Sequence, residues 1–307
     1  MKNKLTLTTL ATKLFLITCM TFNFTLNASS DFYGKINMSI AQIDDGLDTE
    51  IDTLNNASRV GFKSKLKLSD NLNFLIQIEN EIDPTDGRAD GDKVFKQRNT
   101  FIGISGNFGK FFVGTHDTAF KKAQLKVDLF NDTQSDIKNI LRGENRMQDL
   151  VGYESPELFN GIKIVINNIK TSDKSYQSYS LNYNSDSFKA SYSIDTGLKG
   201  YDSQRITSSY VFNKTTLGVI YQDSEKTTIG NNESGYVYSI KHKISKKGSL
   251  LFQEAKSDMK VTGGKQTSFG YNHQIRKELK VFTAYSQLSK DNSPDKDWIT
   301  LGFEYKF

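Results

Sequence analysis

The last ten residues of the chain read WITLGFEYKF, from Trp298 to Phe307, and they decide the fold. Apolar residues alternate with polar or small ones through this stretch. The apolar set is Ile299, Leu301, Phe303, Tyr305 and Phe307. A period of two over nine residues is typical of a β-strand that buries one face. Chain ends are usually polar and frayed, so this one is predicted to lie against apolar surroundings.

The same alternation recurs along the chain. Examples are the stretches 32–43, 59–68, 72–79 and 188–194. We count about sixteen such runs of roughly 8–12 residues, which is the length that a tilted strand needs to cross a bilayer. The three prolines, Pro84, Pro156 and Pro294, fall outside the runs, as a sheet requires. The pattern predicts an all-β protein.

The first thirty residues have the order of a secretory signal peptide. Lysines come first, an apolar stretch follows from Leu14 to about Leu26, and small residues end at Ser30. The alternative is a membrane anchor, but the apolar stretch is shorter than the roughly 20 residues that a spanning helix needs. We therefore expect residues 1–30 to be cleaved and 31–307 to form one β-barrel domain. Cys19 would leave with the signal, so the mature chain has no cysteine chemistry.

Composition and connections separate a membrane barrel from a soluble β-sandwich. Hydrophobic residues are 36% of the chain and the mean hydropathy is −0.51, yet there are 21 Phe and 14 Tyr. Short turns alternate with longer polar segments, and the longer ones include 44–56, 83–95, 225–233 and 289–295. A membrane barrel has short turns at one rim and long loops at the other, whereas a sandwich has no such requirement. The prediction is a transmembrane antiparallel barrel, closed because backbone groups in lipid must all be paired.

Several segments resemble the general porins of Gram-negative outer membranes. They include FYGKINMS (32–39), RNTFIGISGNFGKFFVGTHDT (98–118), RGENRMQDLVGYESPELFNGIKI (142–164) and the terminal FEYKF. The resemblance runs from Phe32 to Phe307. It implies a sixteen-stranded barrel exported through the periplasm, a homotrimer in outer-membrane lipid, short periplasmic turns, long external loops and a third loop folded inward. In one departure, Thr115 stands where the family commonly has an arginine of the pore wall.

The third long loop, residues 118–143, is predicted to form a pore constriction. It carries Asp128, Asp132 and Asp136, while Arg59, Arg98 and Arg146 fall on inward-facing positions of neighbouring strands. Acids that face bases across a narrow pore create a transverse field, which favours hydrated polar solutes. The alternative is that these charges are ordinary solvated residues.

The terminal aromatics have a separate expected role. The resemblance implies that Phe303, Tyr305 and Phe307 act as a signal for assembly into the membrane.

No catalytic, cofactor or metal site is expected. His116, His242 and His273 lack metal-ligand spacing, and the acidic segment 83–92 misses the order of an EF-hand. Removal of the three signal lysines lowers the net charge from +5 to +2, which gives no basis for nucleic-acid binding.

The expected function is a water-filled channel for passive diffusion of ions and small hydrophilic solutes, with a weak anion preference from the many inward lysines. One alternative is a structural or adhesive barrel whose loops bind a surface or receptor. An outer-membrane hydrolase is another, but it would need a Ser/His pair near the rim, which the sequence does not place.

Overall fold

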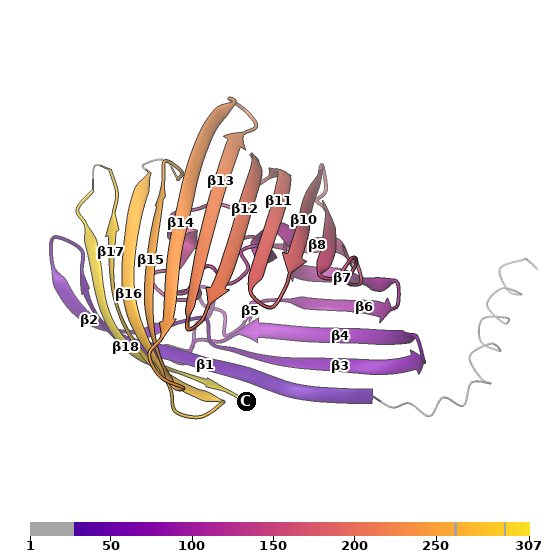
Figure 1. Cartoon of the computed structure of the whole chain (residues 1–307), viewed down its shortest axis with the longest axis horizontal. Helices are drawn as coiled ribbons and strands as arrows, with labels where there is room; N and C mark the ends of the chain where they lie inside the picture. The colour runs from indigo at the N-terminus through magenta and orange to yellow at the C-terminus, as the bar shows by residue number, and fades with distance from the viewer. Residues whose placement is uncertain (1–27, 261–262, 292) are drawn as a thin grey trace, which may run out of the picture.

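The computed structural model describes residues 28–260, 263–291 and 293–307, and folds them around one continuous antiparallel sheet (Figure 1). The strands are β1 Ala28–Asp44, β2 Thr49–Asn55, β3 Arg59–Ser69, β4 Leu72–Glu81, β5 Lys96–Gln97, β6 Thr100–Gly106, β7 Gly109–Asp117, β8 Arg146–Glu154, β9 Ile162–Lys170, β10 Ser175–Asn184, β11 Phe188–Leu198, β12 Tyr201–Phe212, β13 Thr215–Lys226, β14 Asn231–Lys243, β15 Gly248–Ser257, β16 Gly264–Gln274, β17 Leu279–Ser289 and β18 Lys296–Lys306. Two helical turns, α2 (Ala119–Lys122) and η1 (Ile137–Asn139), interrupt this order.

The eighteen segments make sixteen barrel strands. β2 and β3 both pair with β1 and differ by one residue in register, so together they form one barrel strand. β5 and β6 pair with β4 in the same way. The ring closes where β1 meets β18, from Lys35 opposite Lys306 to Asp44 opposite Asp297. The predicted closed barrel of sixteen strands is confirmed.

Side chains alternate between the outer and inner faces as the terminal stretch predicts. In β18, Ile299 and Leu301 are 55% and 57% exposed on the outer face, while Trp298 on the inner face is 6% exposed. The outer face carries most of the exposed large apolar side chains, which would be unfavourable in water but suits lipid. The final strand therefore lies in the wall of the barrel rather than fraying.

The two rims differ, although less than the sequence indicates. We call the rim at the chain's C terminus the turn rim; its connections include 70–71, 107–108 and 213–214. We call the opposite rim the loop rim. The prediction of a loop over 44–56 at this rim is wrong, because 49–55 forms β2. The predicted loop 225–233 shrinks to 227–230. Most side chains of these segments are polar on both faces, so the alternation disappears from the sequence.

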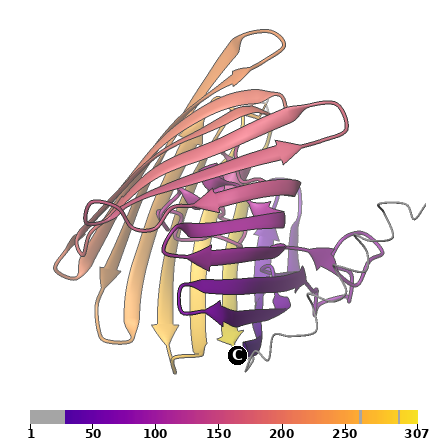
Figure 2. The ribbon, with the colours of Figure 1, turned by 90° about the vertical axis from the view of Figure 1, so that its right-hand side faces the viewer.

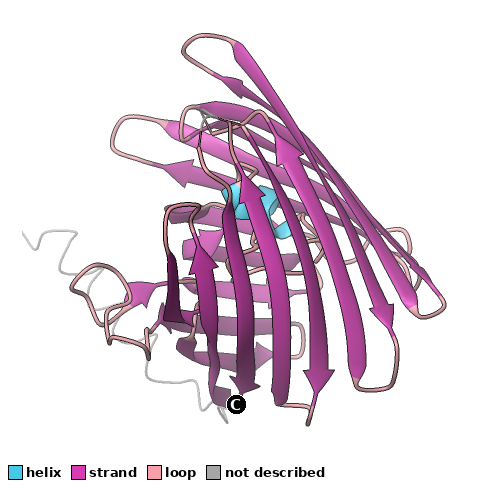
Figure 3. Cartoon of the chain, turned by 90° about the vertical axis from the view of Figure 1, so that its left-hand side faces the viewer, coloured by secondary structure: helices cyan, strands magenta, loops and turns pink. Residues whose placement is uncertain are grey.

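Two connections of the loop rim are long. Loop 82–95 stands away from the barrel wall (Figure 2). The segment 118–145, which we call the inner loop, instead folds back into the barrel, where its helical turns appear in cyan (Figure 3). Within the described ranges, no helix has the length and apolarity of a membrane span.

The predicted signal peptide lies mostly outside the described residues, since these begin at Ala28. Residues 28–30 are the first residues of β1 and pair with 64–66 of β3. Cleavage after Ser30 stays a prediction.

Candidate functional site

The inner loop is held in the barrel by an apolar contact that the sequence did not predict. Its Val127, Ile137, Ile140 and Leu141 are buried against inward-facing side chains of the wall. The wall residues of this cluster are Ala41, Ile43, Ile220, Val237, Ala255, Met259, Leu288 and Trp298. Full burial of one such side chain stabilises by about 1.5–3 kcal/mol, so the loop is a packed element rather than a mobile strand connection.

Polar wall residues bind the backbone of the same loop. The Gln253 side chain of β15 accepts from the Leu129 amide at 2.7 Å and donates to the Ser135 carbonyl at 3.3 Å. Ser257 Oγ donates to the Ile140 carbonyl at 2.8 Å, and the Phe120 amide donates to Ser178 Oγ at 3.0 Å. Because a loop inside a barrel has few other partners, these bonds satisfy its backbone.

Three wall glycines let the loop approach closely. A Cβ on Gly218 would lie 2.9 Å from Val127, one on Gly235 would lie 2.6 Å from Leu141, and one on Gly270 would lie 2.9 Å from Phe130. The sequence signal for this contact is small or amide residues, such as Gly218, Gln253 and Gly270, at inward-facing positions of the strands.

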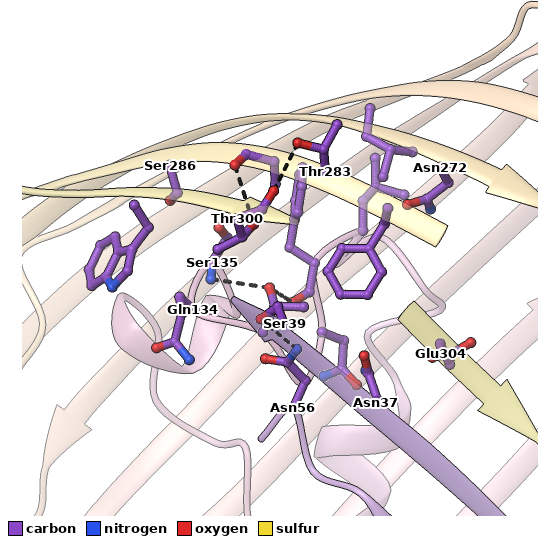
Figure 4. Close-up of a pocket in the computed structure, with 18 of the residues that line it drawn as sticks. Asn37, Ser39, Asn56, Gln134, Ser135, Asn272, Thr283, Ser286, Thr300 and Glu304 are labelled. Atoms are coloured by element: carbon purple, nitrogen blue, oxygen red, sulfur yellow. Dashed lines mark hydrogen bonds between the residues drawn. The ribbon is translucent and has the colours of Figure 1, made fainter. Parts of the chain in front are cut away.

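A small polar cavity separates the loop tip from β1, β17 and β18 (Figure 4). Its volume is about 50 Å³, and Asn37, Ser39 and Asn56 line one side. Asn56 Nδ2 donates to Ser39 Oγ at 3.0 Å. Within the described ranges the Oδ1 atoms of Asn37 and Asn56 have no protein partner, so the cavity offers ordered water both room and acceptors.

Asp132 at the loop tip reaches two bases of the wall, one on β1 and one on β3. Its carboxylate lies 2.7 Å from Lys35 Nζ and 3.3 Å from Arg59 Nη1. Burial alone would raise the pKa of Asp132, but the charges of Lys35 and Arg59 outweigh it and lower the pKa to about 2. The predicted residues Asp132 and Arg59 are therefore brought together, and Lys35 joins them.

Arg98 and Arg146 form ion pairs with acids of the wall rather than with the loop tip. Arg98 binds Glu79 at 2.9 Å and Glu81 at 2.7 Å. Arg146 lies 3.0 Å from Asp117, the last residue of β7. The strand alternation predicts inward-facing positions for Glu79 and Glu81 but does not predict their pairing with Arg98, and Asp117 has no predicted role.

Asp128 and Asp136 have a different role from the one predicted. Asp128 is 6% exposed and accepts from the amides of Phe130 and Ile137, and burial beside Asp136 raises its pKa. Asp136 is 3% exposed; it caps η1 through the Lys138 amide and accepts from the Asp132 amide at 3.0 Å. Neither faces an arginine within ion-pair distance in the part of the chain that the structure describes. They shape the loop that presents Asp132.

A cavity of about 540 Å³ runs beside the inner loop, and several of these charged residues line it. We call it the aperture. Its lining residues are Arg59, Glu79, Arg98, Asn99, Asp117, Lys121, Lys122, Gln124, Leu125, Lys126, Asp128, Asn131, Asp132, Asn182, Tyr183, Asn184 and Lys189. Its lining holds both acids and bases, from the inner loop and from the strands, and it includes Arg59, Arg98, Asp128 and Asp132 of the predicted residues.

The remaining predicted positions are found on the wall. Thr115, in place of the family's arginine, is 7% exposed and pairs with Thr100. Phe303, Tyr305 and Phe307 are 44%, 44% and 57% exposed on the outer face. The Phe307 backbone exchanges two hydrogen bonds with Gly34 at 3.0 and 3.1 Å, so the last residue closes the barrel.

The described part of the chain contains no group of three or more His, Cys, Asp or Glu side chains that could hold a metal ion.

Comparison with known proteins gives curated relatives that the chain matches in part. It is 34% identical over 103 residues to the major outer membrane protein P.IB of Neisseria sicca, which is 32% of this chain and 28% of that protein. It is 24% identical over 215 residues to a monosaccharide porin of Halomonas sp, or 62% of this chain and 57% of that protein. The matches thus span between about a quarter and three fifths of these relatives.

Solved structures match over nearly the whole chain. An anion-selective porin from Comamonas acidovorans has a TM-score of 0.79 at 17% identity and covers 92% of this chain and 100% of its own. Salmonella typhi OmpF in complex with daunomycin has a TM-score of 0.72 at 15% identity, with coverage of 91% and 97%. At these identities the likeness shows the fold.

The family model described as Gram-negative porin matches residues 18–307, which is most of the sequence. The chain belongs to the Gram-negative porin family, the β-barrel proteins of the bacterial outer membrane.

Proposed function

We propose that this protein is a channel for passive diffusion of ions and small hydrophilic solutes across the outer membrane. The observation that carries the proposal is the aperture: a cavity of about 540 Å³ lined by charged and amide side chains within a closed barrel. A polar path through an apolar-coated wall lowers the cost of moving a hydrated solute past lipid, because the solute exchanges water for polar partners. The family and the curated porins that it resembles support the same function.

In this proposal the aperture selects solutes by size and by its transverse field. Asp132 of the inner loop binds Lys35 and Arg59 of the wall, and Arg98 and Arg146 bind acids nearby. Aligned opposite charges order water and disfavour apolar solutes. Because these arginines are paired with acids, their contribution to ion selectivity is smaller than their number indicates, which fits a weak anion preference.

A flux assay tests the size limit. Purified protein reconstituted in liposomes should cause swelling in sugars, with a rate that falls as the sugar grows from a pentose to a trisaccharide. Folded barrels that cause no swelling with any of these sugars would contradict passive diffusion and favour the adhesive alternative.

The proposal also covers export, orientation in the membrane and association of copies. Residues 1–30 direct export through the periplasm, the turn rim faces the periplasm, and three copies associate through their outer walls. One solved relative is a trimer form of an outer membrane protein of Vibrio cholerae, which supports a trimer here. Crosslinking of membranes that contain the protein, followed by electrophoresis without heating, measures the number of copies.

A further inference from the structure

The inner loop contains a strained turn that points a lysine into the aperture. Leu125 and Lys126 have φ values of +51° and +61°, in the left-handed region that residues other than glycine rarely adopt. The turn is closed by the Val127 amide, which donates to the Gln124 carbonyl at 2.9 Å. Strain of this kind persists only where the surrounding structure imposes it, and it is concentrated at functional positions.

The packing of the next residue explains how the turn is imposed. Val127 is 2% exposed and lies directly against Gly218, whose neighbour across the sheet is Ser239. Lys126 itself is exposed and lines the aperture. With Val127 fixed on the wall, the Lys126 ammonium is held over the part of the lumen between the inner loop and the turn rim.

Other lysines converge on the same region. Lys189 lines the aperture and is the second residue of β11, next to a connection of the turn rim. Lys241 lies two residues beyond Ser239 on the inner face of β14, and Lys243 follows it at the end of that strand. Lys126, Lys243 and Lys280 are close enough to Lys241 to act on it electrostatically.

These lysines are not neutralised, unlike Lys35, Arg59 and Lys110. Across the described ranges, no ion pair within 4.0 Å involves Lys126, Lys189, Lys241 or Lys243. Nearby acids are already engaged, since Glu304 binds Lys280 and Lys306, and Glu154 binds Lys110 and Lys122. The result is an uncompensated positive region on the turn-rim side of the inner loop.

We propose that Lys126, Lys189, Lys241 and Lys243, the lysine cluster, bind polyvalent anions such as small phosphate-bearing solutes as they cross the channel. This inference rests on the proposed channel function and deepens it. An ammonium group is a compact charge that binds phosphate oxygens without demanding a fixed geometry. Several of them spaced around a water-filled cavity engage a polyvalent anion at more than one oxygen, whereas chloride engages one at a time.

Single-channel recording with tripolyphosphate as the probe tests this proposal. In KCl, tripolyphosphate should reduce the open-channel current of the wild type more than added KCl of the same ionic strength. The variant K126Q/K241Q/K243Q should need about ten times more tripolyphosphate for half-block, because each exposed ion pair contributes modestly and three are removed. Unchanged mobility of the unheated protein on electrophoresis checks that the variant is folded.

Two matched variants control for charge and location. K126R/K241R/K243R keeps the positive charges and should keep the block. K138Q/K260Q removes lysines on the loop-rim side of the inner loop and should also leave the block unchanged. Open channels without block, or equal block in the triple glutamine variant, would overturn this inference alone. A protein that forms no channels would overturn the proposed function with it.

Discussion

The carboxylate of Asp132 joins the inner loop to β1 and β3. Its backbone has a φ of +69°, a conformation that aspartate tolerates better than most residues, and its amide is held by Asp136. Its carboxylate binds Lys35 and Arg59. The Asp132 side chain therefore also fastens the tip of the inner loop to β1 and β3.

Replacement of Asp132 by Asn should shift ion selectivity toward anions. The substitution releases Lys35 and Arg59 from their shared acid and adds uncompensated positive charge within a Debye length of the path, about 10 Å at 0.1 M salt. The reversal potential in a KCl gradient measures the shift. The opposite change, R59S/R98S/R146S, should widen the aperture and move the reversal potential toward cations. If neither variant changes conductance or reversal potential, these residues do not line the conducting path.

The Asp132 carboxylate also makes the stability of the fold depend on pH. Because its pKa falls from 3.8 to about 2 on folding, the ionised form stabilises the fold by on the order of 2 kcal/mol above pH 4. This contribution is lost as pH falls from about 4 through 2. Current noise in the wild type should therefore rise below pH 4, and D132N should be equally noisy at neutral pH and at pH 3. A wild type that is no noisier at pH 2 than at pH 7 would contradict this role.

At the scale of elements, the docking of the inner loop decides whether the aperture keeps its shape. Replacement of Gln253 by Leu leaves the buried Leu129 amide and Ser135 carbonyl without their partner. Each unsatisfied group costs about 1–3 kcal/mol, so the loop should loosen while the barrel remains closed. We expect more frequent current fluctuations and faster cleavage within 118–145 by added protease. Gln42→Leu, on the exposed outer face of β1, is the matched control and should show neither effect.

The last strand is the element on which closure depends. F303D/Y305D/F307D places three charges on the outer face of β18, and each costs up to a few kcal/mol near the bilayer midplane and less toward its edge. Deletion of Phe307 alone removes both hydrogen bonds to Gly34. Both variants should lower the amount of folded protein in the outer membrane, measured by mobility without heating. Wild-type levels of folded triple variant would refute an assembly role for these residues.

The wall was predictable from sequence because one rule governs it. Strands with one face in lipid and one in water must alternate, as Ile299 and Thr300 do. The rule fails in β2, where both faces are mostly polar, so the sequence predicts a loop there. It also fails where the inner face meets protein, so that Ile220 and Trp298 point inward against the inner loop.

The site was only partly predictable for a related reason. Alternation placed Arg59, Arg98 and Arg146 on the inner face, but a loop has no periodicity. Asp132 binds the wall, whereas Asp128 and Asp136 bind the loop's own backbone. Nothing in the sequence distinguishes the first of these residues from the other two. Such a distinction depends on tertiary packing.

For the whole molecule, the closed ring and the inner loop act together. Pairing of β1 with β18 removes the free edges, and lipid covers the apolar outer face. The interior is then divided by the inner loop, which fills one side with packed side chains and leaves the aperture on the other. In the proposed function, this remaining space is an open aqueous path.

Single-channel recording of the purified, folded protein in a planar bilayer tests directly whether this path is open. We predict discrete current steps in KCl whose conductance rises with salt concentration, and a larger step in a variant that lacks residues 119–144. Folded protein that inserts without current steps, while the loop-deleted variant conducts, would show that the inner loop seals the barrel and would contradict the account.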